Sequence, residues 1–248
     1  MLDGLALSLA GIAETLAISV PTVAEAALGR LTMESCDRRL ARWSRRVLAQ
    51  AGASIRVSGQ ENLVAGRTYV VMSNHRSLYD VPVLFSAYPG RLRMVAKTEL
   101  FKVPIWGRAM RVAGFIEVDR QRAERAIESL RRAKQVLDGG TSVWIAPEGT
   151  RSKTGELGRF KSGGFMLALE TSHAILPVAL RGTEQILPAK GARVRRGAEV
   201  EVRFGTPIDP AAYGLDRRGA LIDAVRTEIA SMLAAPAETT ASQPSPAR

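Results

Sequence analysis

Apolar and polar residues follow distinct patterns along this chain, and the first of them occupies its N-terminal end. Residues 2–29 are strongly apolar, and the acidic residues among them are Asp3, Glu14 and Glu25. A membrane-spanning helix needs about 20 apolar residues without a central charge, and Glu14 lies in the middle of this segment. We therefore expect a helix that enters one leaflet or packs on the domain, interrupted at Pro21 because proline lacks a backbone N–H.

The second pattern, over residues 37–49, predicts an amphipathic helix. At about 100° per residue, most of its apolar side chains, including Trp43, cluster on one side. The other side collects five arginines: Arg38, Arg39, Arg42, Arg45 and Arg46. Such a helix is typical of a phospholipid interface, so we expect these arginines and Trp43 to contact an anionic membrane. A surface helix packed on its own domain has the same pattern.

From Ser54 onward, short β-rich runs alternate with helical ones. Strands are expected at 54–58, 68–73, 93–97, 115–119, 142–147, 174–180 and 199–205. Helices are expected at 78–87, 122–137, 163–172 and 216–234. This alternation predicts an α/β fold with a mixed, largely parallel sheet flanked by helices. The predicted organisation is a helical membrane-associating segment (1–52), an α/β domain (53–235) and a disordered tail (236–248).

Charge narrows the choice of partner. The 248 residues carry 35 Lys and Arg against 24 Asp and Glu, a formal net charge of +11. This excess favours nucleic acid, an anionic bilayer or a phosphorylated substrate. Nucleic acid is the weaker choice, because aromatic residues make up only 5% of the chain and do not alternate with basic ones. One cysteine and two histidines are too few for a His/Cys metal site, so we expect no metal.

The first motif that carries chemistry is His75, which follows an apolar strand, with Asp80 five positions later at an expected helix start. This spacing lets the carboxylate accept the Nδ1 proton of the imidazole, which leaves Nε2 as a base. The pair resembles a Ser-His-Asp triad without its serine, so the nucleophile would be a hydroxyl of the substrate. Backbone N–H groups near the His75 turn are candidate donors to the oxyanion. Taken alone, the pair is better explained by a histidine that caps a helix or is hydrogen-bonded in the core.

A second motif follows the strand expected at 142–147. Gly149 allows close backbone approach, Thr150 offers a hydroxyl, and Arg151 can hold a phosphate through two parallel hydrogen bonds. Glu148 can orient an arginine or a substrate hydroxyl. If this strand is parallel to the one that ends at Ser73, both motifs emerge at one edge of the sheet, where sites of open α/β sheets form.

Four blocks in this order resemble the glycerophospholipid acyltransferases, specifically the bacterial-type 1-acyl-glycerol-3-phosphate acyltransferases. That family carries Asn-His-x4-Asp, Gly-x5-Arg, Glu-Gly-Thr-Arg and a proline-containing strand. The corresponding residues here are Asn74-His75 with Asp80, Gly114 with Arg120, Glu148-Gly149-Thr150-Arg151, and Leu176-Pro177-Val178. The resemblance covers roughly residues 54 to 205. Ala146 departs from the aromatic residue usual before this proline, which leaves the acceptor and the chain-length preference open.

The resemblance implies roles for individual residues. His75 would be the general base and Asp80 the residue that orients it. The implied glycerophosphate site contains Arg120, Glu148, Gly149, Thr150 and Arg151, and Lys97 is a further candidate to bind the anionic substrate.

The resemblance also implies a reaction and its place. A fatty acyl group would pass from acyl-CoA or acyl carrier protein, which are substrates rather than cofactors, to the free hydroxyl of 1-acyl-sn-glycerol-3-phosphate, giving phosphatidic acid. Another lysolipid, such as a lyso-ornithine lipid, is the alternative acceptor. A basic module that binds nucleic acid is the alternative from another class. We expect the protein on the cytoplasmic face of a membrane, as a monotopic or peripheral protein.

Overall fold

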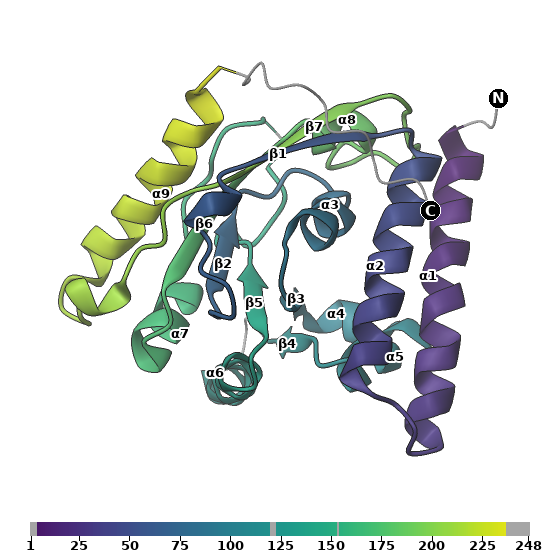
Figure 1. The fold of residues 1–248 in the computed structure, drawn as a ribbon, viewed down its shortest axis with the longest axis horizontal. Coiled ribbons are helices and arrows are strands. Elements are labelled where there is room, and N and C mark those ends of the chain that lie inside the picture. Colours follow the sequence, from purple (N-terminus) through teal and green to yellow (C-terminus); the bar gives the residue numbers. More distant parts are fainter. Residues whose placement is uncertain (1–3, 120–122, 153, 237–248) are drawn as a thin grey trace.

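Seven strands pair into one sheet with the order β1-β7-β6-β2-β5-β3-β4 (Figure 1). The computed structural model describes residues 4–119, 123–152 and 154–236. The strands are β1 (Ser54–Ser58), β2 (Val70–Ser73), β3 (Leu92–Lys97), β4 (Ile116–Val118), β5 (Ser142–Ile145), β6 (Ile175–Arg181) and β7 (Glu199–Phe204). All neighbouring strands are parallel except β6 and β7. The expected mixed, largely parallel sheet is confirmed, and every expected strand is present.

Helices cover both faces of this sheet. They are α1 (Gly4–Ala27), α2 (Met33–Gln50), α3 (Asp80–Ala87), α4 (Thr98–Phe101), α5 (Trp106–Val112), α6 (Ala123–Asp138), α7 (Gly163–Thr171), α8 (Thr183–Ile186) and α9 (Arg218–Ala234). Alternate strand residues point to opposite faces. In β2, Val71 belongs to the core shared with α2 and α3, whereas Val70 and Met72 belong to the core shared with α6, α7 and α9. The short helices α4, α5 and α8 were not predicted, because each is too short to show a helical repeat.

Helix α1 runs without a break through Pro21, so the expected interruption there is wrong. Its contacts with α2 hold it on both sides of the proline. Before Pro21, Glu14 pairs with Arg46, with 2.7 Å between Oε1 and Nη2. After Pro21, Glu25 pairs with Arg39. Within the described residues, α1 is the helix that is long and apolar enough to cross a bilayer.

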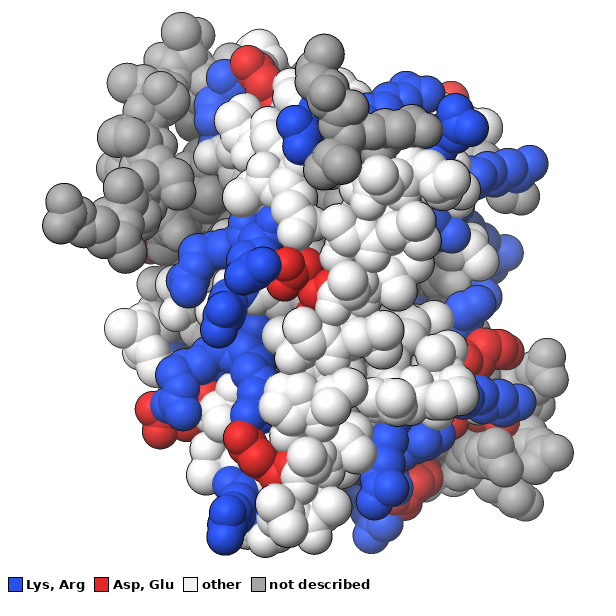
Figure 2. Space-filling view, turned by 90° about the vertical axis from the view of Figure 1, so that its right-hand side faces the viewer, with Lys and Arg blue, Asp and Glu red and all other residues white. Residues whose placement is uncertain are grey.

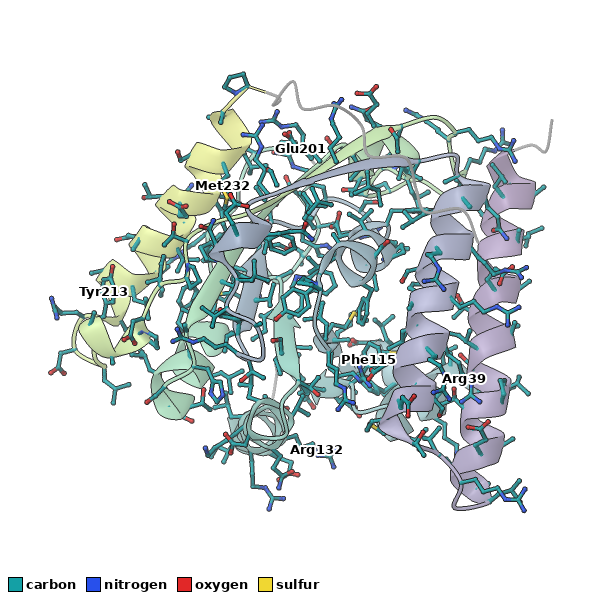
Figure 3. The ribbon with its side chains drawn as sticks, in the orientation of Figure 1. Arg39, Phe115, Arg132, Glu201, Tyr213 and Met232 are labelled. Carbon is teal, nitrogen blue, oxygen red and sulfur yellow. The ribbon has the colours of Figure 1, made fainter. Side chains whose placement is uncertain are left out.

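The arginines of α2 do not all form one outward face, which corrects the sequence interpretation. Arg39 lies between α2 and α1 (Figure 3), where it donates to Glu25 and to Thr22 Oγ1. Its hydrogen bond holds the pKa of the Glu25 carboxyl below the ordinary value. Arg46 has an intermediate position: its side chain is 52% exposed, yet it is paired with Glu14 of α1. The other exposed arginines of α2 are Arg38, Arg42 and Arg45.

Trp43 also departs from the expected membrane contact. Its indole N–H donates to Thr15 Oγ1 in α1 over 3.1 Å, and the residue is half-buried between the helices. The hairpin of α1 and α2 is tied to the sheet as well. Arg93 in β3, itself 3% exposed, pairs with Asp37 in α2 over 2.7 Å and donates to the Ala113 carbonyl. The hairpin is therefore part of the packed fold.

Candidate active site

The two sequence motifs meet at one edge of the sheet, as expected. Strand β2 lies between β5 and β6 and runs parallel to both. Met72 in β2 is in register with Ile145 in β5, so the segments that follow leave the sheet side by side. His75 follows β2 and Glu148 follows β5. The parallel order thus brings residues from distant parts of the chain together.

His75 and Asp80 form a hydrogen-bonded pair, with 2.6 Å between Nδ1 and Oδ2. Asp80 is the first residue of α3 and is fully buried. The His75 side chain is 21% exposed. Among the described residues, its Nε2 has no hydrogen-bond partner. The predicted geometry is confirmed: a buried carboxylate holds one ring nitrogen and the other remains available to a substrate.

The Asp80 carboxylate accepts three further hydrogen bonds. Oδ2 also accepts the backbone N–H groups of Arg76, over 2.8 Å, and Ser77, over 3.0 Å. Oδ1 accepts the hydroxyl of Thr183, at the start of α8. The Asp80 carboxylate is therefore held opposite the His75 ring by groups from two separate parts of the chain.

Glu148 holds the backbone of the His75 loop, a role that the sequence pattern did not predict. Its Oε1 accepts the His75 backbone N–H over 2.8 Å, and its Oε2 accepts the Gly158 N–H over 2.9 Å. The residue is 8% exposed. A second link runs the other way, because Ser152 N–H donates to the His75 carbonyl over 2.7 Å. The loop after β5 therefore holds the backbone of His75 on both sides, at its N–H and at its carbonyl.

These bonds correct the expected oxyanion donors. The N–H of His75 is bonded to Glu148, and those of Arg76 and Ser77 are bonded to Asp80. An N–H already bonded to a carboxylate is not free to stabilise a developing negative charge. The oxyanion donors therefore do not come from residues 75–77.

Asn74 and Arg76, on either side of His75, also have structural contacts. The Asn74 amide bridges β2 to β6, with 2.8 Å bonds to both the N–H and the carbonyl of Leu180. Arg76 donates to the Gly155 carbonyl and to Glu184 Oε1. In the sequence, the only sign that Asn74 bridges two strands was its place as a polar residue between an apolar strand and His75. Its partner could not be read from the sequence.

The remaining candidate residues lie around this pair with fewer contacts. Gly149 has a φ of 76°, a conformation that favours glycine. Thr150 is exposed and Arg151 is half-buried, and Arg151 has no hydrogen bond or ion pair with any described residue. Lys97 is exposed at the end of β3, on the same edge of the sheet. Arg120 lies outside the described residues, as does the tail beyond residue 236.

An apolar pocket of about 90 Å³ lies under α1, between that helix and α2, α3, α5 and β3. Trp43, Phe85 and Trp106 contribute to its wall, and so does Val81, which directly follows Asp80 in α3. Cys36 lines it too, and burial raises the pKa of the Cys36 thiol. The pocket therefore extends from the hairpin to the helix that carries Asp80.

The outward side of α1 is apolar along its length. Its exposed large side chains, between 41% and 59% exposed, are Leu5, Leu9, Ile12, Leu16 and Val20. Figure 2 shows this band of uncharged residues, with Lys and Arg gathered along both of its sides. Both acidic residues described in α1, Glu14 and Glu25, are paired with α2. The side of α1 that faces away from the protein is thus a long apolar strip flanked by cations.

Three comparisons relate this chain to known proteins. A family model described as Acyltransferase matches residues 54–181. Over 155 residues the chain is 37% identical to the chloroplastic 1-acyl-sn-glycerol-3-phosphate acyltransferase LPAT1 of Arabidopsis thaliana, which covers 62% of this chain and 43% of that protein. Over 176 residues it is 33% identical to 1-acyl-sn-glycerol-3-phosphate acyltransferase alpha of Homo sapiens, which covers 71% of this chain and 62% of that protein. The chain thus spans less than two thirds of the length of these relatives.

The fold is also similar to a solved structure. The crystal structure of the 1-acyl-sn-glycerophosphate (LPA) acyltransferase PlsC from Thermotoga maritima superposes with a TM-score of 0.68 at 26% sequence identity. The match covers 83% of this chain and 83% of that chain. It therefore extends well beyond residues 54–181.

Proposed function

Because this chain belongs to the acyltransferase family whose model matches its residues 54–181, we propose that it acylates 1-acyl-sn-glycerol-3-phosphate. The acyl group comes from an acyl thioester, and the product is phosphatidic acid. The observation that carries the proposal is the 2.6 Å contact between His75 Nδ1 and Asp80 Oδ2, near Arg151, which has no ion pair with any described residue. The names of the two curated relatives and of the solved structure support the same acceptor.

The reaction needs one base and no nucleophile from the protein. His75 Nε2 takes the proton of the acceptor hydroxyl as its oxygen forms a bond to the thioester carbonyl carbon. The tetrahedral intermediate then collapses, the carbon–sulfur bond breaks, and the thiolate leaves. The imidazolium, stabilised by Asp80, returns the proton to the thiolate. The active site is thereby restored without a covalent acyl-enzyme.

Arg151 is the described cation best suited to hold the acceptor phosphate. It belongs to the loop that Glu148 and Ser152 fasten to His75, so a phosphate bound there is held at a constant place relative to the base. Its guanidinium can bond to two phosphate oxygens at once. Holding the acceptor in this way converts an encounter in solution into a positioned reaction. Lys97 adds positive charge at the same edge of the sheet.

The apolar pocket provides a place for part of a fatty acyl chain. It is lined mainly by hydrophobic side chains, and it reaches Val81, next to Asp80. Burying a methylene group in such a pocket stabilises binding by about 0.8 kcal/mol. An acyl chain held there would extend toward the His75–Asp80 pair. The carrier, coenzyme A or acyl carrier protein, stays outside this pocket.

The proposal places the protein on a membrane surface, as a monotopic protein on the cytoplasmic face. One side of α1 packs along α2 and α5, so lipid can surround only its outward side. That side is the apolar strip with flanking cations (Figure 2). An apolar face with basic borders suits the boundary between acyl chains and anionic headgroups. A helix packed in this way lies along one leaflet more readily than it crosses a bilayer.

The decisive experiment measures thiol release from a fatty acyl thioester with and without lysophosphatidic acid. We expect acceptor-dependent release, with labelled phosphatidic acid as the product. His75→Ala should lower the turnover by at least about 10²-fold, the usual contribution of a general base. His173→Ala is the matched control, because His173 Nδ1 is hydrogen-bonded to the Thr171 carbonyl and, among the described residues, to no part of the His75–Asp80 pair. Near-parental turnover by purified, folded His75→Ala protein would refute the proposal.

A further inference from the structure

The Asp80 carboxylate is held from two sides. Its Oδ2 takes the His75 ring and two backbone N–H groups of its own loop. Its Oδ1 is bonded to the hydroxyl of Thr183, which is 103 residues away in the sequence. Among the described residues, no other donor reaches Oδ1. Thr183 is thus the contact that links the His–Asp pair to β6 and α8.

The chain around Thr183 is built to bring this hydroxyl to Asp80. Strand β6 ends at Arg181, and Gly182 follows with a φ of 91°. A side chain at Gly182 would have its Cβ 2.1 Å from the Glu199 carbonyl, so only glycine fits this turn. Thr183 is then the first residue of α8 and is fully buried. Its own carbonyl accepts the Leu187 N–H, so its backbone is held in place.

We infer that Thr183 is a positioning residue for the transfer reaction: its hydroxyl sets the orientation of the Asp80 carboxylate and, through it, that of the His75 ring. This inference rests on the proposed function, because it takes His75 as the base. With Oδ1 bonded to Thr183, the carboxylate cannot rotate about its Cβ–Cγ bond, and Oδ2 stays opposite Nδ1. Without that bond, Oδ1 is a buried charged oxygen without a donor, which favours rotation toward other donors.

A purely structural role predicts different behaviour. A buried hydroxyl that only satisfies its surroundings affects stability, and its loss leaves the turnover of the folded protein unchanged. A residue that aligns the base affects the step in which the base acts. It lowers kcat and leaves the KM values for thioester and acceptor unchanged, because it touches neither substrate.

The experiment compares Thr183→Val, which keeps the shape but removes the hydroxyl, with Thr183→Ser, which keeps the donor. We expect Val to lower kcat by about tenfold or more, the equivalent of one hydrogen bond to a charged group. We expect Ser to stay within about twofold of the parent, and the KM values to stay constant. Thr171→Val is the matched control, because the Thr171 hydroxyl donates to the Leu167 carbonyl in α7 and has no contact with the His–Asp pair among the described residues. A folded Thr183→Val protein with a kcat within twofold of the parent overturns the inference.

Two further measurements keep the test decisive. If Thr183→Val does not fold, Thr183→Ala and Thr183→Ser differ by the hydroxyl alone, and equal turnover of these two variants overturns the inference. The imidazole Nδ1 proton can also be followed by nuclear magnetic resonance. The Thr183→Val change should shift the His75 signal and leave that of His173 in place. Inactive His75→Ala together with fully active Thr183→Val refutes only this inference, whereas active His75→Ala refutes the proposed function.

Discussion

The carboxylate of Glu148 accepts the backbone N–H of His75 over 2.8 Å, across 73 residues of sequence. The loop that carries His75 is therefore held by a side chain that follows the neighbouring strand β5. The same carboxylate accepts Gly158 N–H, which fastens the following loop as well. The site is a small network of polar groups from the segments that follow β2, β5 and β6.

Replacing Glu148 tests this clamp. Glu148→Gln leaves one oxygen for two N–H donors, so either His75 or Gly158 loses its acceptor. We expect kcat to fall by about 10- to 100-fold, and the free energy of unfolding to fall by about 1–3 kcal/mol. Kinetics and denaturant titration measure the two effects. Glu156→Gln, at an exposed position of the same loop, is the control and should behave as the parent. Parental values for both quantities would contradict the role assigned to Glu148.

Arg151 should act on binding more than on turnover. Arg151→Ala is expected to raise the KM for lysophosphatidic acid by about 10- to 100-fold with little change in kcat, because the interaction is made equally in the ground and transition states. Arg151→Lys should recover part of the loss, since it keeps the charge but not the two parallel bonds. Arg159→Ala, at an exposed cation, should change neither constant. An acceptor KM unchanged by Arg151→Ala would exclude the phosphate role.

The apolar strip of α1 predicts membrane binding. The double variant Leu9→Asn/Leu16→Asn should weaken cosedimentation with anionic phospholipid vesicles by about tenfold or more, because burying a leucine side chain contributes roughly 1.5–3 kcal/mol. Leu215→Asn is a suitable control, since Leu215 is 60% exposed on a different part of the surface. Equal vesicle binding by the double variant and the parent would show that α1 does not contact lipid.

Cys36 reports on the pocket. Burial raises the pKa of its thiol, so less of the reactive thiolate is present at each pH than in a free cysteine. We expect iodoacetamide to react slowly near pH 7, with the rise in rate displaced to higher pH. Unfolding in denaturant should remove the displacement. A non-hydrolysable fatty acyl thioester analogue should slow the reaction further, and failure to do so would place the acyl chain elsewhere.

The hairpin of α1 and α2 should loosen in acid. Arg39 lowers the pKa of Glu25, so the pair contributes stability above the ordinary pKa of a glutamate. That contribution is lost as the pH falls through the lowered pKa of the folded protein. Glu25→Gln should therefore be less stable than the parent at neutral pH and approach it in acid. A stability difference that is constant between about pH 7 and pH 3 would contradict this account.

Much of this fold could be predicted because its information is local. A short apolar run predicts each of the seven strands, and the order of strands and helices predicts a largely parallel sheet. The pairing of His75 with Asp80 was also accessible, since both residues lie on one turn between β2 and α3. Helix α5 escaped prediction because its Trp106–Val112 segment is too short for a periodic pattern.

The contacts that surround the site were not accessible from the sequence. Nothing local marks Glu148 as the acceptor of the His75 N–H, or Thr183 as the donor to Asp80. The arginines of α2 show the same limit, because the helical period predicts their directions but not that Glu25 and Glu14 of α1 would meet Arg39 and Arg46. These are contacts between segments far apart in sequence.

The sequence by itself determined the elements, their largely parallel arrangement and the pairing of His75 with Asp80, because periodicity and spacing act over a few residues. Only the tertiary structure decided which groups hold that pair in place, which arginines of α2 pair with α1, and where an apolar pocket forms. Those properties depend on which strand ends become neighbours in the sheet, and strand order is set by packing of the whole chain.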